Sequence, residues 1–264
     1  MNETSSKNEI TSGIIWKQLL LFFFPILLGS FFQQLYNTID AVIVGRFVGK
    51  NALAAVAGSS GMVINLLVNF FTGLTAGASV IVSQFFGSGD RKKVDDSIHT
   101  IYAFSIIGSV IMTLIGITAA PALLRLMNTP EELMSDSILY LRIYFAGIFF
   151  VFIYNTGAGL LRALGDSRRP LYCLMICCVI NIVLDLLRIV GLGLGVAGAA
   201  IATLLSQGIS AVIVTVFLMR QKDLCDFSLK EIRIHPKLLK SELLLGLPGG
   251  FQYAMYSISN MIIQ

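Results

Sequence analysis

The feature that most constrains this chain is a series of apolar runs, each long enough to cross a lipid bilayer. A helix needs about 20 apolar residues to span the ~30 Å hydrocarbon core. Six complete runs lie at 17–44, 53–86, 98–126, 138–162, 170–190 and 194–219, and a seventh begins near Leu243. Because lipid offers no partners for backbone N–H and C=O groups, such runs must be helical. The sequence therefore predicts an all-α, polytopic membrane protein: a bundle of six transmembrane helices followed by a partial seventh helix.

The composition also favours lipid as the solvent. Only 13% of the 264 residues are charged and 56% are hydrophobic, whereas a soluble domain has about 25% charged residues. Too few polar side chains remain to cover a water-facing exterior. The basic residues form short clusters between the apolar runs, which indicates membrane orientation rather than nucleic-acid binding. We therefore expect a lipid bilayer as a partner and no nucleic acid.

The distribution of Lys and Arg predicts the orientation. These residues gather in the N-terminal segment and in the loops after the second, fourth and sixth runs, and are sparse in the other loops. The positive-inside rule then predicts a multi-pass protein of the cell (plasma or inner) membrane with a cytoplasmic N-terminus. The chain divides into a cytoplasmic tail (1–16), a six-helix lobe (17–219), a cytoplasmic loop (220–242) and the beginning of a seventh helix (243–264).

Two acids lie inside the apolar runs, Asp40 in the first and Asp185 in the fifth. An acid at the centre of a membrane helix costs about 2.5–3.5 kcal/mol on insertion scales, so such residues usually serve a function. Both acids lie well along outward-running helices, so we expect them at similar depth. Other polar side chains are expected near that depth or on the same helical faces: Tyr36, Asn37, Tyr140, Asn155, Asn181 and Thr203.

Such a group of side chains suits the binding of a small cation. Carboxylates in a medium of low dielectric constant can take up and release a proton near neutral pH. Carboxylate and carbonyl oxygens also suit a hard cation such as Na⁺. The candidate Na⁺ ligands are Asp40, Asn181, Asp185 and Thr203, and no catalytic residue is expected because the chain is not predicted to be an enzyme.

Structural explanations for the two acids remain open at this stage. Asp185 could form an ion pair with Arg188, three residues further along the helix. Asp40 could mark a helix end, with its carboxylate reaching water at the membrane surface. Among the cysteines, Cys173 and Cys177 share a helical face, but without a nearby His or acid they are predicted to be small buried hydrophobes.

A faint internal repeat hints at a second half. With a shift of 220 residues, Gly29 falls on Gly249, Tyr36 on Tyr256 and Asp40 on Asn260. The shift corresponds to six runs, so the seventh run would begin a copy with the same orientation as the first. Parallel repeats are a transporter architecture in which the substrate binds between the halves.

Several segments resemble the multidrug and toxic compound extrusion (MATE) family. They are "PILLGSFFQQLYNTIDAVIVGRFVG" with "ALAAVAGSS", then "TGLTAGASVIVSQFFGSGDRKKV", "GLLRALGDSRRP" and "NIVLDLLRIVGLGLGVAGAAIATLLSQ". The resemblance covers the chain from about residue 15. It implies one lobe of a twelve-helix, two-lobed secondary antiporter that exports cationic or amphipathic compounds in exchange for H⁺ or Na⁺, with no other cofactor.

The resemblance also implies roles for individual residues. Asp40 matches the acid of the family's first helix, Asn181 and Asp185 match the asparagine–aspartate pair of the fifth, and Thr203 matches the threonine of the sixth. Tyr140 and Asn155 fall near polar positions of the fourth helix. A complete member continues through further helices, so a C-terminal lobe is expected as the missing partner. The alternatives are a lipid-linked saccharide flippase of the wider superfamily and an inactive, truncated half-transporter.

Overall fold

The computed structural model describes the chain from residue 14 to residue 263, and its side chains as far as residue 259. The side chain of Asn260, expected to be the counterpart of Asp40, therefore lies outside the described part. Long helices account for most of the chain: α1 (Ile15–Phe47), α3 (Gly61–Gly87), α4 (Arg91–Leu126), α5 (Glu131–Ala163), α6 (Arg168–Asp185), α7 (Gly195–Met219) and α8 (Pro236–Ile263). Short elements complete it: α2 (Lys50–Ala55), two π-helical segments (Val56–Ser60 and Leu186–Gly191) and a 3₁₀ turn (Leu229–Glu231).

The predicted all-helical membrane architecture is confirmed. Within residues 14–263, six helical segments are long and apolar enough to cross a bilayer: 15–47, 50–87, 91–126, 131–163, 168–191 and 195–219. Each overlaps one of the six predicted runs. Helix α8 is not among them, because glycines, Pro248 and polar residues interrupt its apolar run.

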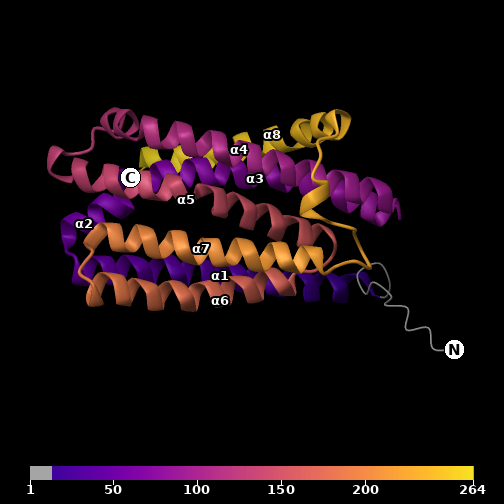
Figure 1. Ribbon diagram of the computed structural model, residues 1–264, viewed down its shortest axis with the longest axis horizontal. Coiled ribbons are helices and arrows are strands. Elements are labelled where there is room, and N and C mark those ends of the chain that lie inside the picture. Colours follow the sequence, from indigo (N-terminus) through magenta and orange to yellow (C-terminus); the bar gives the residue numbers. More distant parts are fainter. Residues whose placement is uncertain (1–13, 264) are drawn as a thin grey trace.

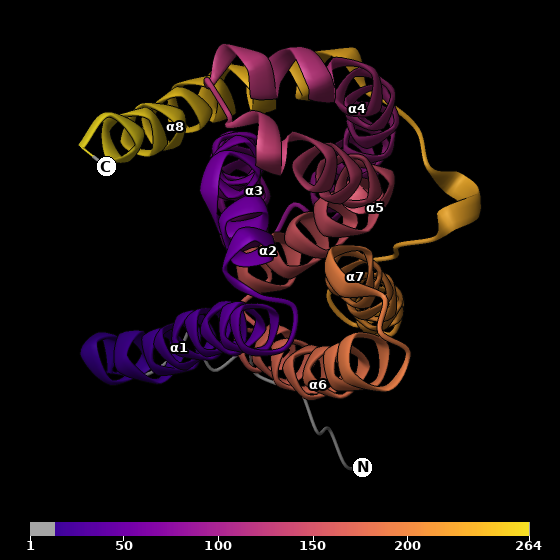
Figure 2. The same cartoon turned by 90° about the vertical axis from the view of Figure 1, so that its left-hand side faces the viewer.

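The long helices lie roughly side by side in alternating directions (Figure 1). Viewed end-on, α1, α6 and α7 form one side of the bundle, α3, α4 and α8 form the other, and α5 lies between them (Figure 2). The chain between α7 and α8 runs along the outside of the bundle. The outer ends of α1 and α8 project on the same side, with α3 between them.

Two short turns show how the sequence separates consecutive helices. Gly89 (φ 75°) and Gly165 (φ 91°) adopt left-handed backbone conformations that glycine tolerates without steric cost. Each is followed by an aspartate that caps the next helix: Asp90 accepts a hydrogen bond from Lys93 N, and Asp166 accepts from the backbone N–H groups of Arg168 and Arg169. The hydrogen bonds from Lys93 lower the pKa of Asp90.

Two boundaries differ from the sequence expectation. The run at 53–86 is divided, because Gly58 has non-helical dihedral angles inside the π-helical segment Val56–Ser60. This break separates α2 from α3. Helix α8 begins at Pro236, inside the segment 220–242 that was expected to be a loop. Proline suits the first turn of a helix, where its missing N–H leaves no hydrogen bond unmade.

Much of the outer surface is apolar. Large side chains of α1 such as Trp16, Leu19 and Phe24 are more than half exposed. Exposed apolar surface of this extent indicates contact with lipid or with another protein segment. The packed interior forms two clusters of buried side chains, one around Phe145 and Phe152 and one around Ile98 and Leu161.

The contact between α4 and α5 yields a test of packing. A Cβ atom at Gly116 of α4 would overlap the ring of Phe145, which is fully buried, so the ring or the helices would have to shift. We expect Gly116→Ala to lower the free energy of unfolding by roughly 1–3 kcal/mol, the usual cost of overpacking. Gly87→Ala is the matched control because nothing lies within 4 Å of its added Cβ. Thermal unfolding in detergent measures both, and equal stability of the two variants would contradict the packing.

Candidate functional site

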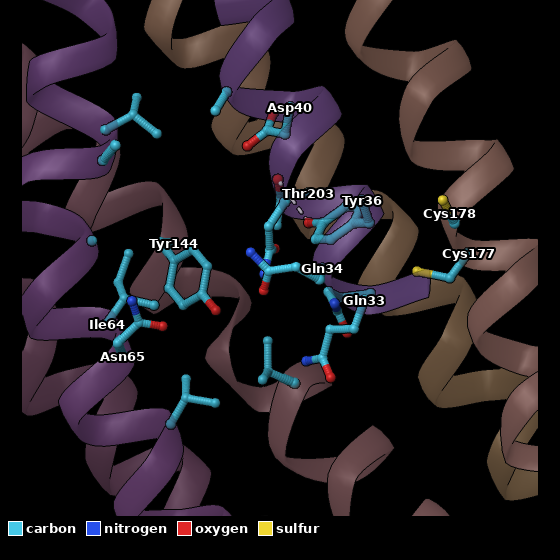
Figure 3. A pocket seen from close by; sticks show the side chains of 18 of the residues that line it. Gln33, Gln34, Tyr36, Asp40, Ile64, Asn65, Tyr144, Cys177, Cys178 and Thr203 are labelled. Carbon is cyan, nitrogen blue, oxygen red and sulfur yellow. Dashed lines mark hydrogen bonds between the residues drawn. The ribbon is translucent and has the colours of Figure 1, made fainter. Parts of the chain in front are cut away.

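A cavity of about 430 Å³ opens between α1, α3, α5, α6 and α7. Figure 3 shows polar side chains entering it from helices on opposite sides. Six of the eight predicted site residues line this cavity: Tyr36, Asn37, Asp40, Tyr140, Asn155 and Thr203. The fold therefore brings together side chains that are more than 160 positions apart in the sequence.

The contribution of α1 comes from one stripe of the helix. Gln33, Tyr36, Asn37 and Asp40 recur at spacings of three and four residues, which places them on a common face. Helix α1 continues for almost two turns beyond Asp40, to Phe47. Asp40 is therefore not at a helix end, and the interpretation that it merely marks one is wrong.

A hydrogen bond joins α1 to α7 across the cavity. The Tyr36 hydroxyl donates to Thr203 Oγ1 over 3.4 Å, the interaction drawn as a dashed line in Figure 3. Thr203 lies near the first turns of α7 and is 6% exposed. This bond is long, but it links two residues that the sequence placed in one site.

Asn181 and Asp185 lie behind the cavity wall rather than on it. Both belong to the last turns of α6, and their exposed fractions are 1% and 0%. The carboxyl group of Asp185 lies close enough to that of Asp40 to interact with it electrostatically. Within the described residues, neither oxygen of Asp185 has a hydrogen-bond partner, and Oδ1 of Asp40 and Nδ2 of Asn181 also lack one.

The helix changes its winding directly after Asp185. The π-helical segment Leu186–Gly191 follows, and π-helical turns often occur at functional sites. Arg188 belongs to this segment, and its Nε has no partner among the described side chains. The described residues therefore do not form the alternative ion pair between Asp185 and Arg188.

Helix α5 supplies tyrosines to another wall of the cavity. Tyr140 and Tyr144 are one turn apart, with ring centroids 6.3 Å from each other. Asn155 also lines the cavity, but its amide nitrogen donates to Val151 O over 2.9 Å within its own helix. Its side-chain carbonyl oxygen is the group that remains for a ligand.

The structure adds polar lining residues that the sequence reading did not select. These are Gln33, Gln34, Asn65, Tyr144, Tyr154 and Gln207. A helical spacing could have indicated two of them, because Tyr144 follows Tyr140 and Gln207 follows Thr203 by four residues. The thiols of Cys177 and Cys178 also reach the cavity, as Figure 3 shows.

The cavity lining carries negative charge only. Asp40 is its acid, Asp185 lies directly behind it, and none of the described lining residues is Lys or Arg. Four tyrosines and the apolar side chains of Val56, Ile64, Val68 and Leu174 complete the wall. Such a surface suits a ligand that is part apolar or aromatic and part cationic.

The comparisons with known proteins agree with this architecture. The family model MatE matches residues 25–187. The probable multidrug resistance protein YpnP of Bacillus subtilis (strain 168) is 37% identical over 257 residues, which is 97% of this chain and 57% of YpnP. The chain therefore spans little more than half the length of this relative.

Solved structures give the same result. The outward-facing conformation of a multidrug resistance MATE family transporter of the MOP superfamily matches with a TM-score of 0.89 at 30% identity, over 98% of this chain and 57% of that one. The inward-facing conformation of such a transporter matches with a TM-score of 0.78 at 32% identity, over 86% of this chain and 51% of that one. The likeness therefore extends over nearly the whole chain in the outward-facing case.

The bond between Tyr36 and Thr203 can be tested in a double-mutant cycle. Tyr36→Phe and Thr203→Val each remove one partner, so their effects on stability should not add. We expect a coupling energy of about 0.5 kcal/mol, at the low end for a hydrogen bond because the contact is long. Thermal unfolding of the four proteins gives the value.

The matched control pairs Tyr36→Phe with Thr38→Val. Thr38 lies on the same helix, but its hydroxyl donates to Gln34 O in its own helix rather than to another one. Strictly additive effects in both cycles would show that the two helices are not joined in this way.

Proposed function

Since the chain belongs to the MATE family, whose members are transporters and not enzymes, we propose that it is the N-terminal lobe of a cation-coupled antiporter. The complete protein would export amphipathic or cationic organic compounds in exchange for H⁺ or Na⁺. It would do so from the cell membrane, with its N-terminus in the cytoplasm. Alternating access between two lobes would carry the substrate across.

The observation that carries this proposal is the acidic cavity between the helices. Its aromatic and apolar walls can accept the hydrophobic part of a drug-like molecule, and Asp40 supplies the counter-charge. A cavity of about 430 Å³ is within the size range of small-molecule sites, about 300–1,000 Å³. The relatives whose names refer to multidrug resistance support the same class of substrate.

Asp40 and Asp185 are the groups we assign to cation coupling. Two adjacent carboxyls with unfilled hydrogen-bonding capacity can share a proton, or can hold Na⁺ together with Asn181 and Thr203. Binding of the cation would neutralise the pair and change what the cavity attracts. Cation and organic substrate would then compete for the same charge, which is the requirement for exchange.

The flippase alternative receives less support from the cavity. A lipid-linked saccharide carries a pyrophosphate, which calls for Lys or Arg in the binding site. The described lining carries an acid and neutral polar groups instead. An anionic cargo is therefore disfavoured by the charge of the site.

In an outward-facing two-lobed transporter, the cavity of this lobe would be open to the outside of the membrane. In that state the cavity would release its organic substrate and receive the coupling cation. The exposed faces of α1 would then meet the second lobe in part and lipid in part.

Replacing the acids tests the coupling assignment. In the two-lobed transporter, Asp40→Asn and Asp185→Asn should each reduce H⁺- or Na⁺-driven dye efflux by roughly 5- to 150-fold. That range corresponds to the loss of a coupling free energy of about 1–3 kcal/mol. The measurement is initial efflux from proteoliposomes under an imposed H⁺ or Na⁺ gradient.

Asp223→Asn is the matched control, because this exposed acid lies in the segment after α7 and should leave efflux unchanged. Undiminished coupled efflux in both cavity variants would rule out the assignment of these acids. A loss in one variant alone would assign coupling to that acid and not to the pair.

The chain without a second lobe should not transport. Alternating access needs two halves that move against each other, and this chain spans little more than half of its relative. We expect proteoliposomes with the 264-residue chain alone to show no more dye efflux than empty liposomes, and a protein that adds the second lobe to restore it. Equal efflux by both would contradict the assignment of this chain as one lobe.

A further inference from the structure

Glu242 is a buried acid that lies outside the cavity described above. It is 2% exposed and belongs to the first part of α8. Leu244 is 71% exposed, and Leu245 and Leu247 are also exposed. The acid therefore lies on the packed face of α8 with Leu239 and Leu243, which border the same small cavity, while the three exposed leucines face outward.

The surroundings of Glu242 are apolar. It borders a cavity of about 10 Å³ between α3, α4 and α8, which is at the lower limit of the roughly 10–15 Å³ that holds one water molecule. The other lining residues are Leu74, Thr75, Ala78, Ile101, Phe104, Leu239 and Leu243. Thr75 is the polar member of this group, and its hydroxyl donates to Thr72 O over 3.0 Å. Neither carboxyl oxygen of Glu242 has a hydrogen-bond partner in the described part of the chain.

The residues that α3, α4 and α8 place around this cavity include no titratable group other than Glu242 itself, within the described side chains. An ionic cluster lies in the segment just before α8 and near the start of α4. There Asp96 forms an ion pair with Arg233 over 2.7 Å, and His235 Nε2 lies 3.3 Å from the same Asp96 oxygen. Lys240, two residues before Glu242, is exposed and on a different face of the helix.

Close packing of α8 against α3 keeps Glu242 away from water. A Cβ atom at Gly73 would lie 2.5 Å from Gly249 O, and one at Gly77 would overlap the backbone of Gly246. The two helix backbones therefore touch directly, one turn beyond Glu242. Any movement of α8 away from α3 would open this crossing and admit water to the carboxyl.

We propose that Glu242 is a proton-binding site that couples its protonation to the docking of α8 on α3 and α4. The docked helix encloses the carboxyl with no partner and no room for a hydrated ion, so it accepts only the neutral acid. Separation of α8 hydrates the carboxyl and lets the proton leave as H⁺, with the carboxylate remaining on α8. Because α8 would begin the second lobe under the proposed function, this site would link proton release to movement between the lobes.

Spin labels on α3 and α8 test the coupling in the chain as it stands. Cysteines introduced at the exposed positions Val80 and Leu244 carry the labels, in a chain whose four native cysteines are replaced by serine. In nanodiscs we expect a short label-to-label distance at low pH that lengthens as the pH rises. Glu242→Gln should keep the short distance throughout, because its side chain cannot ionise. Glu231→Gln, an exposed glutamate before α8, should behave as the unchanged chain does.

Infrared spectroscopy supplies a second measurement on the same proteins. We expect a protonated-carboxyl band that disappears as the pH rises, that is absent in Glu242→Gln and that is shifted in Glu242→Asp. The last variant keeps a carboxyl group, so it serves where Glu242→Gln does not fold. A distance that does not respond to pH, the same response with and without Glu242, or an unchanged carboxyl band would each overturn the proposal.

These readouts do not depend on transport, so the two proposals fail separately. Loss of the Glu242 signals with normal Asp40-dependent efflux would remove the proton site and leave the proposed function. If the Glu242 signals are observed but replacing Asp40 or Asp185 does not change efflux, the proton site stands and the coupling role of these two acids fails.

Discussion

The absence of hydrogen-bonding partners in lipid is the constraint on which the rest of this structure depends. It forces the backbone into helices and makes every polar side chain within them costly unless a neighbouring helix covers it. The described bundle responds by turning apolar side chains outward along α1, α4 and α6 and by gathering amides, hydroxyls, tyrosines and Asp40 around one internal cavity. The site is thus where the bundle places polar groups that cannot face lipid.

Irregular backbone occurs at the cavity and directly after Asp185. The π-helical segment Val56–Ser60 precedes α3, and Leu186–Gly191 begins immediately after Asp185. Departures from regular helix at membrane depth are tolerated where they are covered by protein or border a cavity. Asp40 and Asp185 belong to the regular parts of α1 and α6, and Oδ1 of Asp40 and both oxygens of Asp185 have no hydrogen-bond partner among the described residues.

The sequence was sufficient to predict the helices, and part of the site, for different physical reasons. Long apolar runs leave a membrane helix as the only solution, so six spans could be read directly. The stripe Tyr36, Asn37 and Asp40 followed from helical periodicity, but whether it faced a cavity or lipid depended on packing. Periodicity could not show that Asn181 and Asp185 lie behind the cavity wall, because their faces are set by how α6 rotates against α1 and α7. The division at Gly58 also escaped prediction, since isolated glycines are tolerated inside membrane helices.

Glu242 illustrates a different limit of sequence reasoning. In "KSELLLGLPGG" the glutamate would be expected to face water or the membrane surface rather than the packed interior. The face of α8 is decided instead by Gly246 and Gly249, which permit a backbone contact with α3 that no larger residue allows. Glu242 lies one turn before Gly246 on the same face, so it is buried with them.

Asp40 lies about 37 Å along α1 and Glu242 about 9 Å along α8, at 1.5 Å per residue from helix starts at the same end of the bundle. Asp40 and Glu242 therefore occupy different depths, and a movement that opens the crossing between α3 and α8 can hydrate Glu242 without opening the contact between Asp40 and Asp185.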